Sequence, residues 1–137
     1  MLDELQTENY AMNFKYTIFY VEDVAATLVF YENAFGLQRA FLHEGGDYGE
    51  LATGQTKLAF SSRALMRSLG KNPSVADPKS PSFEIAFETD DVAASLQRAV
   101  GAGAVLVMEP TKQPWGQTIS YVSDPNGYLV EICSPVS

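Results

Sequence analysis

Few side chains in this sequence can act as nucleophiles or as soft metal ligands. The 137 residues include one cysteine, Cys133, and one histidine, His43. A single cysteine excludes an intrachain disulfide framework and a zinc site built from several cysteines. The two residues lie far apart in the sequence, so we interpret Cys133 as a small core residue rather than a nucleophile. No Gly-rich phosphate loop or Ser-His-Asp order is present.

Two further residues bear on the chemistry of a site. His43 precedes the polar turn of residues 44–47, which indicates a surface position rather than that of a catalytic base. Trp115 is the only tryptophan and precedes a predicted strand. A large amphipathic ring at such a position either packs in the core or forms a wall against a ligand, and the sequence leaves both interpretations open.

Charge and composition limit the partners of the chain. The 17 acidic and 9 basic residues give a formal net charge of −8, which repels phosphate backbones, so we expect no nucleic-acid partner. No apolar run is long enough to span a bilayer, and residues 1–10 are too acidic and polar for a secretory signal. We therefore expect a cytoplasmic protein with no membrane partner. The length allows one compact unit.

A repeat with an offset of about half the chain organises the sequence. Residues 23–28 recur as residues 91–96, an offset of 68 (91 − 23), with five of six residues identical. The flanks match in the same register, because Phe19 corresponds to Phe87 without a gap. One short match would be compatible with chance. The offset and the matching flanks together indicate a duplicated module.

Each copy begins with a strand and a helix. Aromatic and β-branched residues favour strands within 14–23 and 82–91. Asp23 and Asp91 then follow as N-cap residues, whose carboxylates can accept hydrogen bonds from free backbone N–H groups. Gly36 predicts the end of the first helix. Apolar residues at helical spacing form its buried stripe: Val24, Leu28, Tyr31 and Phe35.

Three more strands are expected in each copy, at 38–43, 48–53, 56–61, 104–108, 117–122 and 128–133. The pattern predicts an α+β fold, with two tandem βαβββ modules whose curved mixed sheets surround a cleft.

The predicted modules leave two other segments. The first module covers residues 14–61 and the second covers residues 82–137. Residues 1–13 form an N-terminal tail. Residues 62–81 contain three prolines and scattered charges, and we interpret them as a linker, with a lid beside a pocket as the alternative.

Several motifs carry a resemblance to a known family. They are Trp115-Gly116-Gln117, Phe30-Tyr31, Gly36-Leu37 and residues 124–131, DPNGYLVE. Together they resemble the vicinal oxygen chelate superfamily, which includes glyoxalases, bleomycin-resistance proteins and extradiol dioxygenases. The resemblance covers one domain, residues 14–134, and implies the paired-module fold. It leaves function open, because this scaffold hosts isomerases, dioxygenases, thiol transferases and drug-binding proteins. Asp124 itself is better explained as a turn residue than as a catalyst.

The resemblance also implies four metal-ligand positions, on the first and last strands of each module. The first-strand positions fall on Tyr16 and Glu84. The last-strand position of the second copy is Glu131, four residues after Gly127, and the same count from Gly54 falls on Leu58.

This set of four is poor for a transition metal. Imidazole nitrogen is missing and a phenol is a weak ligand at neutral pH. We therefore expect no metal cofactor. If a divalent metal does bind, a hard ion held by Glu84 and Glu131 together with water would fit best.

Strand alternation predicts which residues line the cleft. Ile18 and Tyr20 share the face of Tyr16, whereas Phe19 and Val21 face the helix. The residues expected to bind a ligand are Tyr16, Glu84, Glu131, Trp115, Phe60 and Tyr48.

The two carboxylates have two potential roles. If both face one cavity, repulsion and desolvation raise the pKa of at least one, and Glu131 could then transfer a proton as the catalytic residue. Alternatively, the pair neutralises a cationic ligand between aromatic walls. A purely structural alternative puts Glu84 on an exposed sheet surface or in an ion pair with Arg63.

Two functions therefore compete. The favoured hypothesis is a bleomycin-resistance-like protein that binds a small, cationic molecule in an acidic aromatic cleft without a transition metal. The alternative is a metal-dependent lyase or dioxygenase of the glyoxalase type. The resemblance further implies a homodimer.

Overall fold

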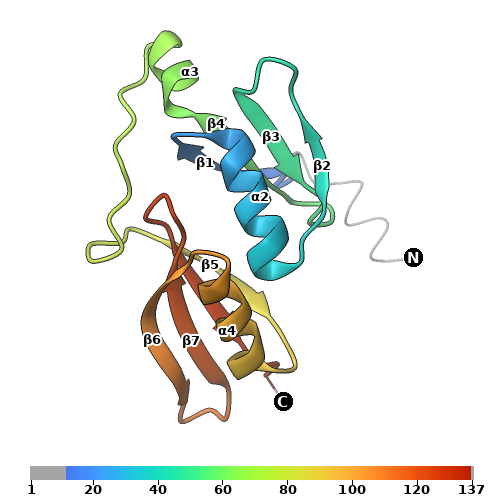
Figure 1. Cartoon of the computed structure of the whole chain (residues 1–137), viewed down its shortest axis with the longest axis vertical. Helices are drawn as coiled ribbons and strands as arrows, with labels where there is room; N and C mark the ends of the chain where they lie inside the picture. Colours follow the sequence, from blue (N-terminus) through green and yellow to red (C-terminus); the bar gives the residue numbers. More distant parts are fainter. Residues whose placement is uncertain (1–11, 137) are drawn as a thin grey trace.

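The computed structural model describes residues 12–136 and has the predicted element order in both halves (Figure 1). Residues 1–11 of the predicted tail and residue 137 lie outside the described part. The first module contains β1 (Tyr16–Val21), α2 (Val24–Phe35), β2 (Arg39–Leu42), β3 (Tyr48–Leu51) and β4 (Lys57–Ser62). The second contains β5 (Glu84–Glu88), α4 (Val92–Gly101), β6 (Val105–Lys112), β7 (Thr118–Ser123) and β8 (Leu129–Cys133).

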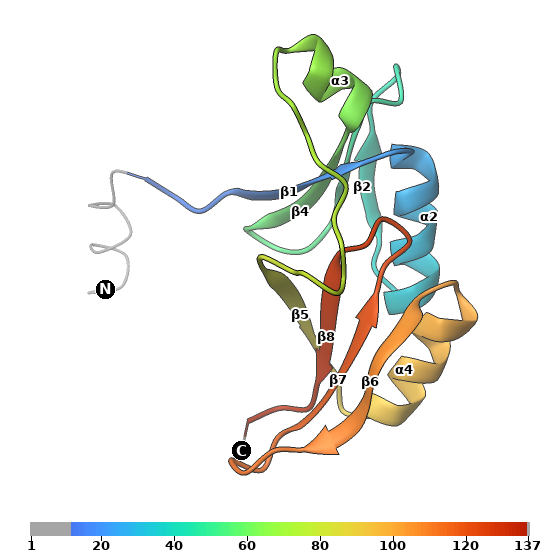
Figure 2. The same ribbon diagram turned by 90° about the vertical axis from the view of Figure 1, so that its left-hand side faces the viewer.

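Each module forms a four-stranded mixed sheet. The strand orders are β1-β4-β3-β2 and β5-β8-β7-β6, with β1 parallel to β4, β5 parallel to β8, and the other pairs antiparallel. The α+β prediction of two βαβββ modules is confirmed. Both helices cover the same side of the molecule, and the opposite side of both sheets carries no helix (Figure 2). We call this second side the helix-free face.

The predicted helix boundaries have the expected local causes. The carboxylates of Asp23 and Asp91 each accept a hydrogen bond of 3.0 Å from the backbone N–H three residues ahead, at Ala26 and Ala94. These bonds satisfy donors that have no partner inside the helix. Gly36 ends α2 in the left-handed conformation, with φ of 70°. Thus the duplicated Asp positions mark the same structural start in both modules.

One hydrophobic core spans both modules between the sheets and the helices. Phe19 and Val21 are buried, whereas Tyr16 and Ile18 are each 43% exposed, which confirms the predicted alternation along β1. Phe60 pairs with Phe19 in the β1–β4 register and is fully buried against Tyr31. The prediction that Phe60 lines the ligand cleft is therefore wrong, because its strand position turns it toward the helix.

A buried carboxylate joins the modules. Asp124 Oδ2 accepts a 2.7 Å hydrogen bond from the Tyr31 hydroxyl of α2, and Asp124 Oδ1 accepts bonds from the backbone N–H groups of Asn126 and Tyr128. Burial raises the pKa of Asp124, although these hydrogen bonds act in the opposite direction. Asp124 thus stabilises its own turn and also fixes that turn to the other module.

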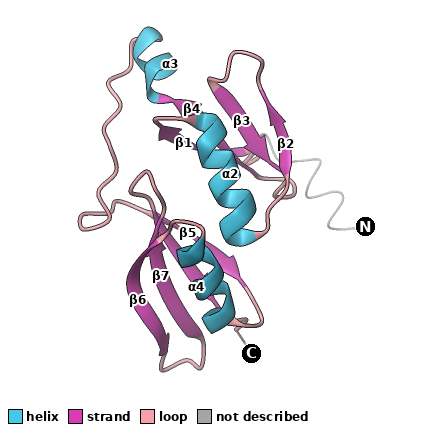
Figure 3. Cartoon of the chain, in the orientation of Figure 1, coloured by secondary structure: helices cyan, strands magenta, loops and turns pink. Residues whose placement is uncertain are grey.

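The segment between the modules is partly helical. It begins with α3 (Arg63–Ser68), whose first turn is capped by the Ser62 hydroxyl. Residues 69–83 then run past the turn between β7 and β8 (Figure 3). A Cβ atom on Gly127 of that turn would collide with the carbonyl oxygen of Ala76, so the two backbones approach as closely as glycine allows.

None of the helices in residues 12–136 is long and apolar enough to cross a membrane.

The Tyr31–Asp124 contact predicts a stability change. We expect Tyr31→Phe to lower the free energy of unfolding by about 1.5–3 kcal/mol, because a buried carboxylate oxygen loses its donor. Tyr16→Phe is the matched control: the Tyr16 ring is exposed, and we expect a change within about 0.5 kcal/mol. Urea denaturation of both variants measures the difference. Equal effects would show that the Tyr31–Asp124 hydrogen bond does not contribute significantly to the free energy of unfolding.

Candidate functional site

The helix-free face brings two predicted site residues together. Glu84 on β5 and Glu131 on β8 lie on neighbouring parallel strands, with Glu131 directly opposite Ala86. The Tyr121 hydroxyl on β7 lies 3.0 Å from Glu84 Oε2 and 2.9 Å from Glu131 Oε1. We call Glu84, Tyr121 and Glu131 the carboxylate cluster. All three side chains come from one module, so the geometry of the cluster depends on the strand register of that sheet.

Tyr121 is the functional residue that the sequence interpretation missed. It lies directly opposite Glu131 in the antiparallel β7–β8 pair. Nothing in the local sequence distinguishes this tyrosine from a packing residue. The register of β7 against β8 would have identified it, because side chains of directly opposed residues lie on the same face of a sheet.

The carboxylate cluster has two carboxylates that can accept hydrogen bonds but only one hydroxyl hydrogen to donate. A phenol carries one hydroxyl hydrogen, so Tyr121 can donate to only one of the two carboxylates. It can accept from the other carboxyl group only if that group is protonated. In agreement, the pKa of Glu84 is raised by desolvation and by the hydrogen bond and charge of Glu131, while the Tyr121 bond opposes the shift. Desolvation and both carboxylates also raise the pKa of Tyr121. The close approach of the two carboxyl groups therefore makes Glu84 easier to protonate than an isolated glutamate.

Cys133 lies next to the carboxylate cluster but is not a nucleophile. Burial, followed by the hydrogen bond and charge of Glu131, raises the pKa of the Cys133 thiol to about 11. The thiolate is the reactive form of cysteine, so this thiol is inert at neutral pH.

The strand register corrects one of the four positions implied by the family resemblance. Glu131 opposes Ala86, whose counterpart 68 residues earlier is Ile18, and Ile18 opposes Ala59. The first-module counterpart of Glu131 is therefore Ala59 and not Leu58, which faces the core. The count from Gly54 fails because the glycine has a different place in the two turns: Gly54 lies five residues before Ala59, whereas Gly127 lies four residues before Glu131.

The first module has its own carboxylate on the helix-free face. Glu50 opposes Ala59, so it is the structural counterpart of Tyr121. The Tyr48 hydroxyl donates a 2.7 Å hydrogen bond to Glu50 Oε2, and Glu50 is only 9% exposed. Desolvation and this bond raise the pKa of Tyr48. Tyr48 and Tyr16 are thus on the predicted face, together with a carboxylate that the sequence interpretation did not include.

Trp115 and His43 lie away from the carboxylate cluster and from the Tyr48–Glu50 pair. Trp115 is 57% exposed in the turn between β6 and β7, where its Nε1 donates to Gln117 and Gln117 in turn donates to the Ser134 carbonyl. It therefore lies at the end of the sheet, beyond the C-terminal end of β8. His43 is exposed in the turn between β2 and β3, where its Nδ1 accepts from the Gly45 N–H.

The cations of the described chain do not neutralise the carboxylate cluster. The two ion pairs among residues 12–136 are Arg39–Glu32 and Arg63–Glu22, both 3.0 Å long. Arg63 also donates to the Tyr20 carbonyl, so the alternative in which it pairs with Glu84 is wrong.

The donor set does not fit a transition metal. The four corresponding positions supply one phenol, one methyl group and two carboxylates, at Tyr16, Ala59, Glu84 and Glu131. Within residues 12–136, no group of three His, Cys, Asp or Glu side chains is placed to hold a metal ion. Such ions usually draw nitrogen or sulfur ligands as well as oxygen.

With this geometry in place, comparison with known proteins identifies the family. A sequence profile described as "Glyoxalase/Bleomycin resistance protein/Dioxygenase superfamily" matches residues 13–132. The chain belongs to this superfamily. A "Probable lactoylglutathione lyase" of Vibrio cholerae serotype O1 is 29% identical over 125 residues, covering 85% of this chain and 86% of that protein.

Solved structures of the superfamily share the fold. A glyoxalase-related enzyme from Fulvimarina pelagi superposes with a TM-score of 0.78 at 23% identity, covering 90% of this chain and 88% of that one. A glyoxalase/bleomycin resistance protein/dioxygenase family enzyme from Burkholderia phytofirmans PsJN superposes with a TM-score of 0.76 at 20% identity. The superposition covers 92% of this chain and 100% of that one. At these identities the similarity shows the fold alone.

The contacts of Glu84 with Glu131 and Tyr121 predict opposite effects of two substitutions on the pKa of Glu84. We expect Glu131→Gln to lower the pKa of Glu84 toward its ordinary value, because the neighbouring charge is removed. Tyr121→Phe should raise it further, because a hydrogen bond to the ionised form is lost. Carbon-13 NMR of the side-chain carboxyl groups measures both changes. Glu88→Gln, on the same strand, is the control and should leave Glu84 unchanged. Shifts of the same sign in the two test variants would contradict the opposing effects of Glu131 and Tyr121 on Glu84.

Proposed function

We propose that this protein binds a small cationic molecule at the carboxylate cluster, and that it does so without a transition metal. The observation that carries the proposal is the arrangement of Glu84 and Glu131 around one hydroxyl, with neither carboxylate in an ion pair among the described residues. A cation at this point would stabilise both carboxylates in their ionised form. Glu84 is exposed and Glu131 is half-buried, so a ligand can reach both.

The surrounding side chains support a cationic rather than an anionic ligand. The net charge of −8 and the carboxylates Glu84, Glu88 and Glu131 repel anions. The Tyr121 ring provides an aromatic surface beside the carboxylates, and cations associate favourably with such rings.

An enzyme of the glyoxalase type is the second candidate function. Its support is the similarity to the Vibrio cholerae protein, whose name describes a lactoylglutathione lyase. In this alternative Glu131 is the proton-transfer base, and a hard divalent ion is held by Glu84 and Glu131 with water. The phenol of Tyr16 is a weak ligand at neutral pH and Ala59 offers only a methyl group, so such an ion would lack oxygen ligands and this alternative is the less favoured one.

Calorimetric titration with metal-free bleomycin, a cationic glycopeptide, in EDTA tests the proposal. We expect binding to the wild type and at least a tenfold loss of affinity in Glu84→Gln and in Glu131→Gln. Glu88→Gln is the control that removes a nearby carboxylate outside the cluster. Affinity should also fall as the pH is lowered through the raised pKa of Glu84, because the protonated carboxyl no longer attracts the cation.

Two results would contradict the proposal. One is binding that is unaffected by both cluster substitutions. The other is stoichiometric transition metal in protein purified without chelator, together with a lyase or dioxygenase activity that is lost in Glu131→Gln. This second result would instead support the enzyme.

We further propose that a second copy of this chain covers the first-module part of the helix-free face. In the first module this face exposes Phe14, Tyr16 and Ile18, and Lys57 shares the face of Tyr16. In the second module it carries the carboxylates. A two-fold dimer would pair the apolar first-module surfaces of the two chains and leave the carboxylate cluster of each second module open to a ligand. Exposed apolar side chains in such a row indicate an interaction surface.

The molecular mass in solution tests the dimer. We expect light scattering to give twice the 15.0 kDa mass of the chain for the wild type and the single mass for Ile18→Glu. Val29→Glu introduces the same charge on the exposed side of α2, and we expect it to remain dimeric. A monomeric wild type, or a dimer lost only in Val29→Glu, would show that the helix-free face is not the interface.

A further inference from the structure

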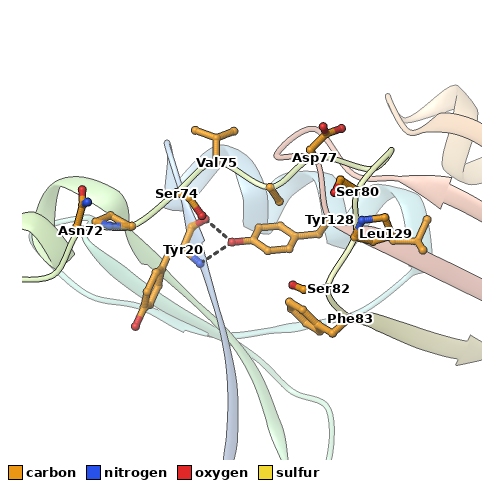
Figure 4. Close-up of a pocket in the computed structure, with 14 residues that line it drawn as sticks. Tyr20, Asn72, Ser74, Val75, Asp77, Ser80, Ser82, Phe83, Tyr128 and Leu129 are labelled. Atoms are coloured by element: carbon orange, nitrogen blue, oxygen red, sulfur yellow. Dashed lines mark hydrogen bonds between the residues drawn. The ribbon is translucent and has the colours of Figure 1, made fainter.

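The connector between the modules lines a half-open cavity that is separate from the carboxylate cluster. Its volume is about 610 Å³, within the range typical of small-molecule sites. Three parts of the chain form its walls: the end of β1, the connector over residues 72–83, and the turn before β8 (Figure 4). No member of the carboxylate cluster lines it.

One wall is aromatic and held in place. Tyr128 lies among the residues that line the cavity (Figure 4). Its hydroxyl accepts a 3.1 Å hydrogen bond from the Tyr20 N–H and donates a 2.7 Å hydrogen bond to the Tyr20 carbonyl. Phe19 stacks on the Tyr128 ring with centroids 4.1 Å apart. The Phe83 ring lines another side of the cavity, with its centroid 6.1 Å from that of Tyr128. These contacts fix the ring faces before any ligand arrives, which reduces the entropy cost of binding.

The opposite wall supplies hydrogen-bonding groups. Asn72, Ser74 and Ser82 line the cavity, and among the described residues their side chains make no hydrogen bond within the chain. The close approach of Ala76 to Gly127 holds the middle of this wall against the turn. A ligand can therefore be contacted by polar groups of the connector on one side and by rings on the other.

The charge of the lining selects among ligands. Asp77 is the one charged side chain in the lining, and its Oδ1 accepts a hydrogen bond from the Lys79 N–H. A carboxylate at the wall and the negative charge of the whole chain disfavour anions. We propose that this cavity is a second binding site, for a planar aromatic molecule that is neutral or positively charged.

NMR titration with three indoles tests this site. Indole, tryptamine and indole-3-acetate carry the same ring with no charge, a positive charge and a negative charge. We expect indole and tryptamine to shift the backbone amides of residues 74–77, 128 and 129. Indole-3-acetate should bind at least tenfold more weakly than tryptamine.

Variants distinguish this cavity from other surfaces. Ser82→Trp and Ser74→Trp each fill the cavity from an exposed position of the connector, and each should weaken tryptamine binding at least tenfold. Gln97→Trp adds the same ring to the exposed side of α4 and should change nothing. Glu131→Gln removes one carboxylate of the carboxylate cluster and should leave these amide shifts intact. The inference is overturned if the shifts are absent, if they are confined to β5 and β8, or if they persist in both filled variants.

Discussion

The buried carboxylate of Asp124 is the contact on which the arrangement of the two modules depends. It accepts hydrogen bonds from Tyr31 of the first module and from two backbone N–H groups of its own turn. Tyr128, at the end of the same turn, hydrogen-bonds both backbone groups of Tyr20. Because a buried acceptor is costly without donors, these partners hold the β7–β8 turn against the first module. The shared core and the inter-module cavity both follow from this position.

The carboxylate cluster depends on a different and more local constraint. Its three members come from β5, β8 and β7, which are adjacent strands of one sheet. Their spacing is therefore set by hydrogen-bonded register and does not require the other module. In the first module the corresponding positions hold Tyr16, Ala59 and Glu50. Duplication thus preserved the scaffold while carboxylates and phenols came to occupy different strands.

The connector has a structural role beyond joining the modules. Its α3 helix continues from β4, and its extended part contacts the turn at Gly127. The close backbone approach explains why the turn needs glycine at this point, where φ is 89° and a side chain would meet Ala76. The same approach closes the cavity that Tyr20, Phe83 and Tyr128 line. A segment interpreted from its prolines as a linker or lid therefore forms one wall of a cavity.

Local rules acting within short stretches of sequence determined the duplicated fold, the helix starts at Asp23 and Asp91, and the alternation of Tyr16 and Ile18 with Phe19. The family resemblance, combined with the repeat, implied that Glu84 and Glu131 lie on the first and last strands of the second module. Only the tertiary structure decided three other points. Phe60 faces the core, because it pairs with Phe19 in the β1–β4 register. Leu58 is not the counterpart of Glu131, because the turn glycines of the two modules lie at different distances from the strands that follow. Tyr121 joins the two carboxylates, because the pairing of β7 with β8 brings together side chains whose separation along the chain carries no periodic signal.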